Sequence, residues 1–240
     1  MQPVLILQFM PDDGAGYLGS WARREGVPLT VRHATSGEPF PPDIGGCSAL
    51  AVLGGAMSVN DDLPYLRDAE RLILQAMAAQ IPVLGHCLGG QLMAHALGAR
   101  VQASPAPEIG WQRIGVRDVP EARSWFGATR EQHVFHWHYE SFALPPGAVL
   151  LAESAACPNQ AFAIGAHLAM QFHVEIDAGK ISDWLAGAEP AYADALRQGT
   201  GSVHSPQQIR QDTDARLAAQ QALADRIYAR WLSTTGGFSR

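Results

Sequence analysis

Residues 82–98, with the sequence PVLGHCLGGQLMAHALG, decide the fold. The short apolar run over residues 81–84 predicts a buried strand. Residues 88–97 repeat apolar side chains at the spacing of one helix face, which predicts a helix directly after it. Cys87 lies between the two, so the stretch predicts a strand, a tight turn that carries a cysteine, and a helix.

The residues around this turn indicate a nucleophilic cysteine. Gly85 and Gly89 leave room for a sharp strand-to-helix turn, which lifts a side chain out of the sheet edge. The positive end of the helix dipole favours the thiolate, the form that attacks a carbonyl carbon. The amide of Leu88 would point to the oxyanion formed by that attack. The alternative is that Cys87 is a small buried hydrophobic residue, because free cysteine is among the most buried residue types.

A candidate base for this cysteine lies far downstream. Residues 169–175, AMQFHVE, alternate as in a strand, which would place His173 and Glu175 on the same face. An imidazole in that position can take the proton of a thiol, while a neighbouring carboxylate fixes its tautomer and stabilises its charge. The pattern therefore predicts a Cys-His-Glu arrangement.

These motifs resemble those of the class I glutamine amidotransferases. Residues 85–91, GHCLGGQ, are similar to the nucleophile elbow G-x-C-x-G-x-Q of that family, and residues 171–175, QFHVE, resemble its Q-F-H-x-E segment. Residues 54–61, GGAMSVND, resemble the glycine-rich oxyanion loop of the stand-alone GMP-synthase-like branch. Residues 108–111, EIGW, and 135–138, FHWH, are similar to further segments of this branch.

The resemblance implies a set of catalytic roles. Cys87 would be the nucleophile, His173 the base and Glu175 the group that orients the base. The amides of Gly55 and Leu88 would form the oxyanion hole. No cofactor is implied.

The resemblance also implies where the substrate binds. The main chain of Trp137, His138 and Tyr139 would hold the α-amino and α-carboxylate groups of glutamine. Gly54 and Gln91 are expected at the same substrate. The sequence departs from the family pattern nearby, since Glu140 stands where aspartate is usual, and Ala169 and Val174 replace a common glycine and proline. The departures leave open whether the substrate is glutamine or a larger γ-glutamyl compound.

Composition limits the class of protein. The chain has 240 residues, 47% of them hydrophobic, which predicts one α/β domain over residues 1–240. A net charge of -6 without a long basic run does not indicate binding to nucleic acid or to a membrane surface. Three cysteines without C-x-x-C spacing indicate neither a disulfide framework nor a zinc site. The N-terminal sequence lacks the features of a signal peptide or a membrane span, so we expect a cytoplasmic protein.

The first half of the chain alternates strands and helices. Strands are expected over residues 4–9, 28–33 and 48–53, with helices over residues 17–25 and 65–80. Asp62 is expected to cap the second of these helices, with Pro64 near its first turn. This alternation predicts a mostly parallel sheet flanked by helices, and the resemblance implies a flavodoxin-like three-layer sandwich. Ligands bind such sheets at the carboxyl ends of the strands, where residues 54–55 and Cys87 both lie.

After Gly98 shorter apolar segments predict a small antiparallel extension, with strand candidates at Val101 and over residues 111–116, 134–137, 148–152 and 161–164. His133, His136 and His138 in this region allow a metal site. Because no carboxylate or thiol is suitably spaced, core packing or substrate contact is favoured and no metal is expected.

The family motifs lie in a core over residues 4–176, and residues 177–233 are expected to be helical. Asp177 would cap a helix that continues to residue 185, and a second helix would cover residues 189–198. A long helix after Ser205 carries an apolar stripe that should pack on the chain's own sheet, with a homodimer interface as the alternative. Residues 234–240 are expected to fray.

Three functional hypotheses follow. The first is a free-standing hydrolase that acts on the γ-amide of glutamine or of a γ-glutamyl compound through a thioester on Cys87. The second is an ammonia-donating subunit that works only with a separate synthetase. The third is a non-catalytic scaffold or a thiol redox sensor, against which His173 and Glu175 argue because a redox cysteine needs no such partners.

Overall fold

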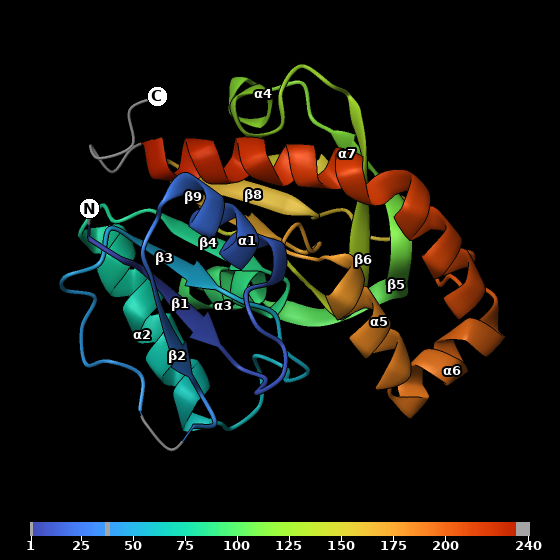
Figure 1. Cartoon of the computed structure of the whole chain (residues 1–240), viewed down its shortest axis with the longest axis horizontal. Coiled ribbons are helices and arrows are strands. Elements are labelled where there is room, and N and C mark those ends of the chain that lie inside the picture. The colour runs from blue at the N-terminus through green and yellow to red at the C-terminus, as the bar shows by residue number, and fades with distance from the viewer. Residues whose placement is uncertain (1, 37–38, 234–240) are drawn as a thin grey trace.

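A computed structural model describes residues 2–36 and 39–233 of the chain, and the expected fraying of residues 234–240 lies outside the described residues. The fold is built on one nine-stranded sheet with the order β2-β1-β3-β4-β9-β8-β7-β5-β6 (Figure 1). The five strands from β2 to β9 are parallel to one another, and the neighbours from β9 to β6 are antiparallel. The predicted α/β fold with a parallel sheet and an antiparallel part is confirmed.

The strands divide between the two parts of the sheet. The parallel part contains β1 (Val4–Gln8), β2 (Leu29–His33), β3 (Ala49–Val52), β4 (Val83–His86) and β9 (His167–Met170). The antiparallel part contains β5 (Val101–Val116), β6 (Glu131–Phe142), β7 (Val149–Glu153) and β8 (Ala161–Ile164). The two parts are continuous because β9 pairs with both β4 and β8.

One strand of the antiparallel part is longer than the sequence indicated. Two separate candidates, at Val101 and over residues 111–116, belong to the single strand β5. The register of β5 against β6 shifts between Ala103 and Glu108, which marks a bulge. Pro105 and Pro107 lie within this shift, where a missing backbone N–H is tolerated. The prolines therefore interrupt the apolar pattern without ending the strand.

Seven helices surround the sheet in the part of the chain that the structure describes. They are α1 (Gly16–Glu25), α2 (Pro64–Ala78), α3 (Leu88–Ala96), α4 (Pro120–Phe126), α5 (Ala178–Ala186), α6 (Pro190–Gln198) and α7 (Pro206–Ser233). Alternate side chains of β1 face opposite layers, since Val4 and Ile6 pack in a core with α1, α4 and α7. Leu5 and Leu7 pack in a second core with α2 and α3. The sheet is therefore the middle of three layers.

The ends of α2 differ from the prediction. The helix starts at Pro64, so its cap is Leu63, which makes no side-chain capping bond, and the expected cap at Asp62 is wrong. Proline is favoured at the first helical position because its missing N–H would be unpaired there anyway, so it replaces the need for a polar cap. The helix ends at Ala78, before Gln80, whose φ of 56° takes the chain out of the helical region.

The C-terminal helix α7 runs across the sheet (Figure 1). Its apolar stripe is buried in the chain's own core at Ile209, Leu223, Ala224, Ile227, Tyr228 and Trp231. The predicted intramolecular packing is therefore present, and the homodimer stays a prediction. Among the described residues, no helix is long and apolar enough to cross a membrane.

Candidate functional site

Cys87 lies at the predicted turn between β4 and α3. Its φ of 48° falls in the left-handed region, which is strained for a residue with a side chain. A Cβ atom on Gly85 would lie 2.6 Å from the backbone of Gly89, and one on Gly90 would lie 2.6 Å from the carbonyl oxygen of Met170. Only glycine fits at these positions. The glycines therefore let the first turn of α3 approach the sheet and hold Cys87 at its edge.

His173 and Glu175 meet in a way that the sequence did not predict. The expected strand over residues 169–175 is wrong, because β9 ends at Met170 and the chain then leaves β4. The backbone amide of His173 instead donates to the carbonyl oxygen of Phe135 in β6, at 2.9 Å. The Nδ1 atom of His173 still lies 2.7 Å from Oε1 of Glu175, so the expected pair is present.

Three of the predicted site residues converge. A Cβ atom on Gly54 would lie 3.0 Å from Cε1 of His173 and 3.7 Å from Cβ of Cys87. Cys87 is 6% exposed and His173 is 2% exposed, so the group is almost enclosed. A Cβ atom on Gly55 would lie 2.9 Å from Cδ2 of Leu88, which brings the two expected oxyanion-hole residues side by side.

Gln91 is tied to the same site by its side chain. Its Nε2 atom donates to the carbonyl oxygen of Glu140, at 3.1 Å, and to Oε1 of Gln171, at 3.3 Å. The Nε2 atom of Gln171 in turn lies 3.5 Å from Sγ of Cys87. Gln171 lies within the Q-F-H-x-E motif, but the motif alone predicts no role for it. The structure places its side chain against Sγ of Cys87.

The three expected substrate residues of β6 have different surroundings. The carbonyl oxygen of Trp137 lies 3.8 Å from Sγ of Cys87, so this main chain borders the site as expected. The side chain of His138 is buried, and the hydroxyl of Tyr139 donates to Glu189 at 2.6 Å. The structure therefore brings the backbone of Trp137 to the cysteine and directs the other two side chains elsewhere.

Charges favour an ion pair between His173 and Glu175. Burial alone would lower the pKa of His173, but the negative charges of Glu175 and Cys87 outweigh it and raise the pKa above the usual 6.5. Burial would raise the pKa of Glu175, but His86 and His173 outweigh it and hold this pKa below its usual range. An imidazolium at His173 is thus the form expected at neutral pH, able to donate a proton.

His86 is a further residue that the sequence analysis did not single out. Its Nε2 atom lies 3.7 Å from Oε2 of Glu175, on the side of the carboxylate away from His173. Burial lowers the pKa of His86, although the negative charge of Glu175 acts in the opposite direction. Its only signal was its place beside Cys87 within the elbow motif.

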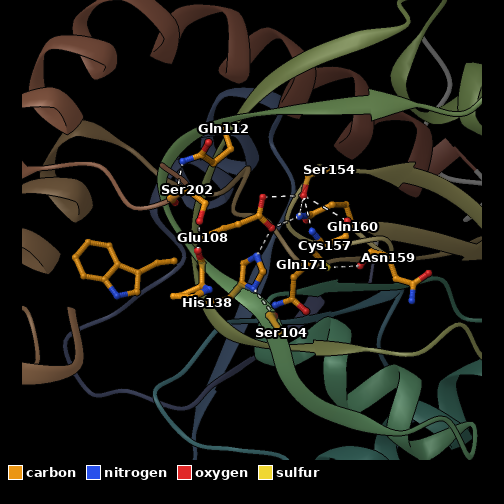
Figure 2. A network of polar contacts seen from close by, with 12 residues as sticks. Ser104, Glu108, Gln112, His138, Ser154, Cys157, Asn159, Gln160, Gln171 and Ser202 are labelled. Atoms are coloured by element: carbon orange, nitrogen blue, oxygen red, sulfur yellow. Dashed lines mark hydrogen bonds and ion pairs between the residues drawn. The ribbon is translucent and has the colours of Figure 1, made fainter. Parts of the chain in front are cut away.

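A buried polar network joins Glu108 of β5 to His138 of β6 and to Ser154 and Gln160 (Figure 2). Ligand atoms of Glu108, His136 and His138 all lie within 4.8 Å of one another, so a carboxylate meets two of the three histidines although none is suitably spaced in the sequence. The pairing of β5 with β6 sets Glu108 opposite His138, which sequence spacing cannot reveal.

Both oxygens of the Glu108 carboxylate have polar partners within the protein. Its Oε2 atom lies 3.1 Å from Nε2 of His138 and accepts a bond from Gln160 at 2.5 Å, while Oε1 accepts from Ser154 at 2.7 Å. Burial would raise the pKa of Glu108, but His136 and His138 outweigh it and lower the pKa to about 2. Two histidines and a carboxylate can bind a transition metal. Here the carboxylate is already bonded within the protein, which fits an ion-pair network, and the absence of a metal stays a prediction.

Comparisons with known proteins agree with this geometry. Residues 22–184 match the family described as glutamine amidotransferase class-I. The glutamine amidotransferase-like protein YfeJ of Salmonella typhimurium is 32% identical over 207 residues, which cover 82% of this chain and 85% of that protein. A glutamine-hydrolyzing GMP synthase of Thermomicrobium roseum is 33% identical over 139 residues, which cover 58% of this chain but only 26% of the synthase.

Among solved structures, a glutamine amidotransferase from Methylobacillus flagellatus has a TM-score of 0.89 and 37% identity, and the match covers 100% of this chain and 96% of that one. The chain therefore belongs to the class I glutamine amidotransferase family.

Proposed function

We propose that this protein hydrolyses the γ-amide of glutamine, or of a γ-glutamyl compound, through a Cys-His-Glu triad. One observation carries the proposal. Cys87 is held in a strained backbone conformation at a helix N-terminus, and beside it His173 is bonded to Glu175. A thiol needs no such pairing for packing, whereas nucleophilic catalysis needs an activated thiolate and an oriented proton carrier.

The first half of the reaction forms a thioester. The Cys87 thiolate attacks the amide carbon, so a carbon–sulfur bond forms and the carbonyl electrons move to oxygen. The amides of Gly55 and Leu88 are proposed to stabilise this oxyanion, a contribution of about 3 kcal/mol for one donor. When the carbonyl re-forms, the carbon–nitrogen bond breaks and His173 delivers its proton to the leaving nitrogen.

The second half restores the enzyme. His173, now neutral, takes a proton from water as the water oxygen attacks the thioester carbon. The carbon–sulfur bond then breaks, which releases the carboxylic acid and returns the thiolate beside an imidazolium. Glu175 keeps Nδ1 of His173 protonated throughout, so that Nε2 is the atom that exchanges the proton.

The test is the release of ammonia and glutamate from glutamine by the purified protein, beside Cys87→Ala. Turnover is expected from the parent protein and from the control Cys47→Ala, whose cysteine precedes β3, whereas the site lies after the ends of the parallel strands β3 and β4. No turnover is expected from Cys87→Ala. Residual turnover by Cys87→Ala at more than about a hundredth of the parent rate would contradict the nucleophile assignment, because loss of such a group costs far more.

The second candidate is an ammonia donor to a separate synthetase. The match to the GMP synthase of Thermomicrobium roseum leaves most of that protein without a counterpart in this chain. No turnover by the isolated chain, together with labelling of Cys87 by an electrophilic glutamine analogue, would favour this candidate over the first.

A further inference from the structure

The ring of Trp184, in α5, covers the proton carrier of the site. Its centroid lies 4.8 Å from that of His173, with the two ring planes at 81°. Two other positions of the imidazole also have neighbours, because Nδ1 is bonded to Glu175 and Cε1 lies near Gly54. Sequence reasoning gave no role to Trp184, which lies in the segment beyond the family motifs.

Several contacts fix this indole in place. Its Nε1 atom donates to Oδ1 of Asp13 at 3.0 Å, in the loop after β1. The ammonium of Lys180 lies 5.5 Å from the centre of the indole and also bonds Asp13, at 2.5 Å. On another side the ring meets Trp137 of β6, with the centroids 5.9 Å apart. Trp184 is thus fixed by contacts with the loop after β1, with its own helix and with β6.

The position of Trp184 matters because of where the leaving group must lie. A group that donates a proton to the leaving nitrogen must come within about 3 Å of it. Any substituent on that nitrogen would then extend from the immediate surroundings of His173, which is 2% exposed and packed against Trp184. Ammonia carries no substituent, so its departure needs no additional space beside Trp184.

We propose that Trp184 restricts the leaving group by its size, so that N-substituted γ-glutamyl amides are excluded as donors. The inference rests on the proposed function and names its substrate class. It makes Trp184 a specificity-determining residue.

The test compares kcat/KM for glutamine with kcat/KM for γ-glutamylmethylamide, each followed by glutamate release. The parent protein is expected to prefer glutamine by at least about tenfold, the scale on which a pocket discriminates against one added carbon. In Trp184→Ala the ratio should fall by about tenfold or more, through a gain on the methylamide. Trp184→Phe, which keeps a ring at this position, should lie between the two.

A matched control separates a specific effect from loosening of the helix. Leu185→Ala removes the next side chain of α5, which is partly buried in the same apolar cluster. This variant should keep the parent ratio. An unchanged ratio in Trp184→Ala, or an equal fall in Leu185→Ala, would overturn the proposal, as would a parent protein that accepts both amides equally.

A second measurement needs no turnover. In a Cys47→Ala background, the rate of alkylation of Cys87 is measured with iodoacetamide and with a bulky pyrene maleimide. Trp184→Ala should raise the maleimide rate relative to the iodoacetamide rate by about tenfold, the same scale of steric discrimination, and an unchanged ratio would overturn the proposed restriction. Absence of Cys87-dependent turnover would instead contradict the proposed hydrolase function, so the two failures are distinguishable.

Discussion

A Cβ atom on Gly89 would lie 2.1 Å from the carbonyl oxygen of Val52. The first turn of α3 therefore touches the backbone of β3 directly, with no side chain between them. This contact sets how far Cys87 stands from the sheet, because Cys87 precedes that turn by one residue.

Gly89→Ala should destabilise the fold by about 1–3 kcal/mol or more, since the added methyl group must displace backbone rather than a flexible side chain. Urea denaturation followed by circular dichroism would measure the change. The control is Gly19→Ala in α1, where a Cβ atom would lie at an ordinary 3.5 Å from Cβ of Ala15. The control should be neutral or stabilising, because alanine favours helix over glycine. An equal free energy of unfolding for Gly89→Ala and Gly19→Ala would contradict the prediction and would mean that α3 can move away from β3.

Cys87 itself should show that the site is strained. With a φ of 48°, its backbone suits glycine better than any residue that carries a side chain. Both Cys87→Gly and Cys87→Ala should be inactive, but the glycine variant should be the more stable by about 1 kcal/mol. Thermal unfolding of the two variants would test this. A more stable alanine variant would show that the turn relaxes when the thiol is removed.

The elbow was predictable because it depends on neighbouring residues. An apolar run, two glycines and an amphipathic segment define a strand, a turn and a helix within residues 82–98, and local rules apply to each. His173 and Glu175 were also found from their local spacing. The strand expected around them was wrong because the chain beyond Met170 loses its partner β4 and pairs with Phe135 instead. Alternation in the sequence cannot tell where a neighbouring strand stops.

The rest of the site depends on contacts between distant segments. Glu108 meets His138 only because β5 and β6 pair in one register, and the bulge shifts that register within β5. Trp184 meets His173 because α5 packs beside β6, where the indole also contacts Trp137. Neither contact leaves a periodic pattern or a motif in the sequence.

The pH dependence of activity should report the ion pair of His173 and Glu175. The raised pKa of His173 keeps the imidazolium, and so the proton for the leaving nitrogen, available above the usual 6.5. Activity should be lost as pH rises through this raised value. In Glu175→Gln the stabilising charge is gone, so the alkaline limb of kcat/KM should move to lower pH and kcat should fall. Profiles of both proteins that coincide in shape would contradict the assigned role of Glu175.

The stability of the fold in acid should depend on Glu108. The pKa of Glu108 is about 2 in the folded protein against the usual 4.5. The ionised carboxylate therefore stabilises the fold by about 3 kcal/mol above about pH 5. This stabilisation is lost as the pH falls toward 2. Glu108→Gln should therefore be much less stable than the parent near neutral pH and should approach it near about pH 2. Urea midpoints at several pH values would measure the difference. Glu131→Gln, which removes a carboxylate of an exposed ion pair with Arg113, should change stability little at any pH. A stability loss in Glu108→Gln that is the same at every pH would mean that Glu108 acts through packing and not through its charge.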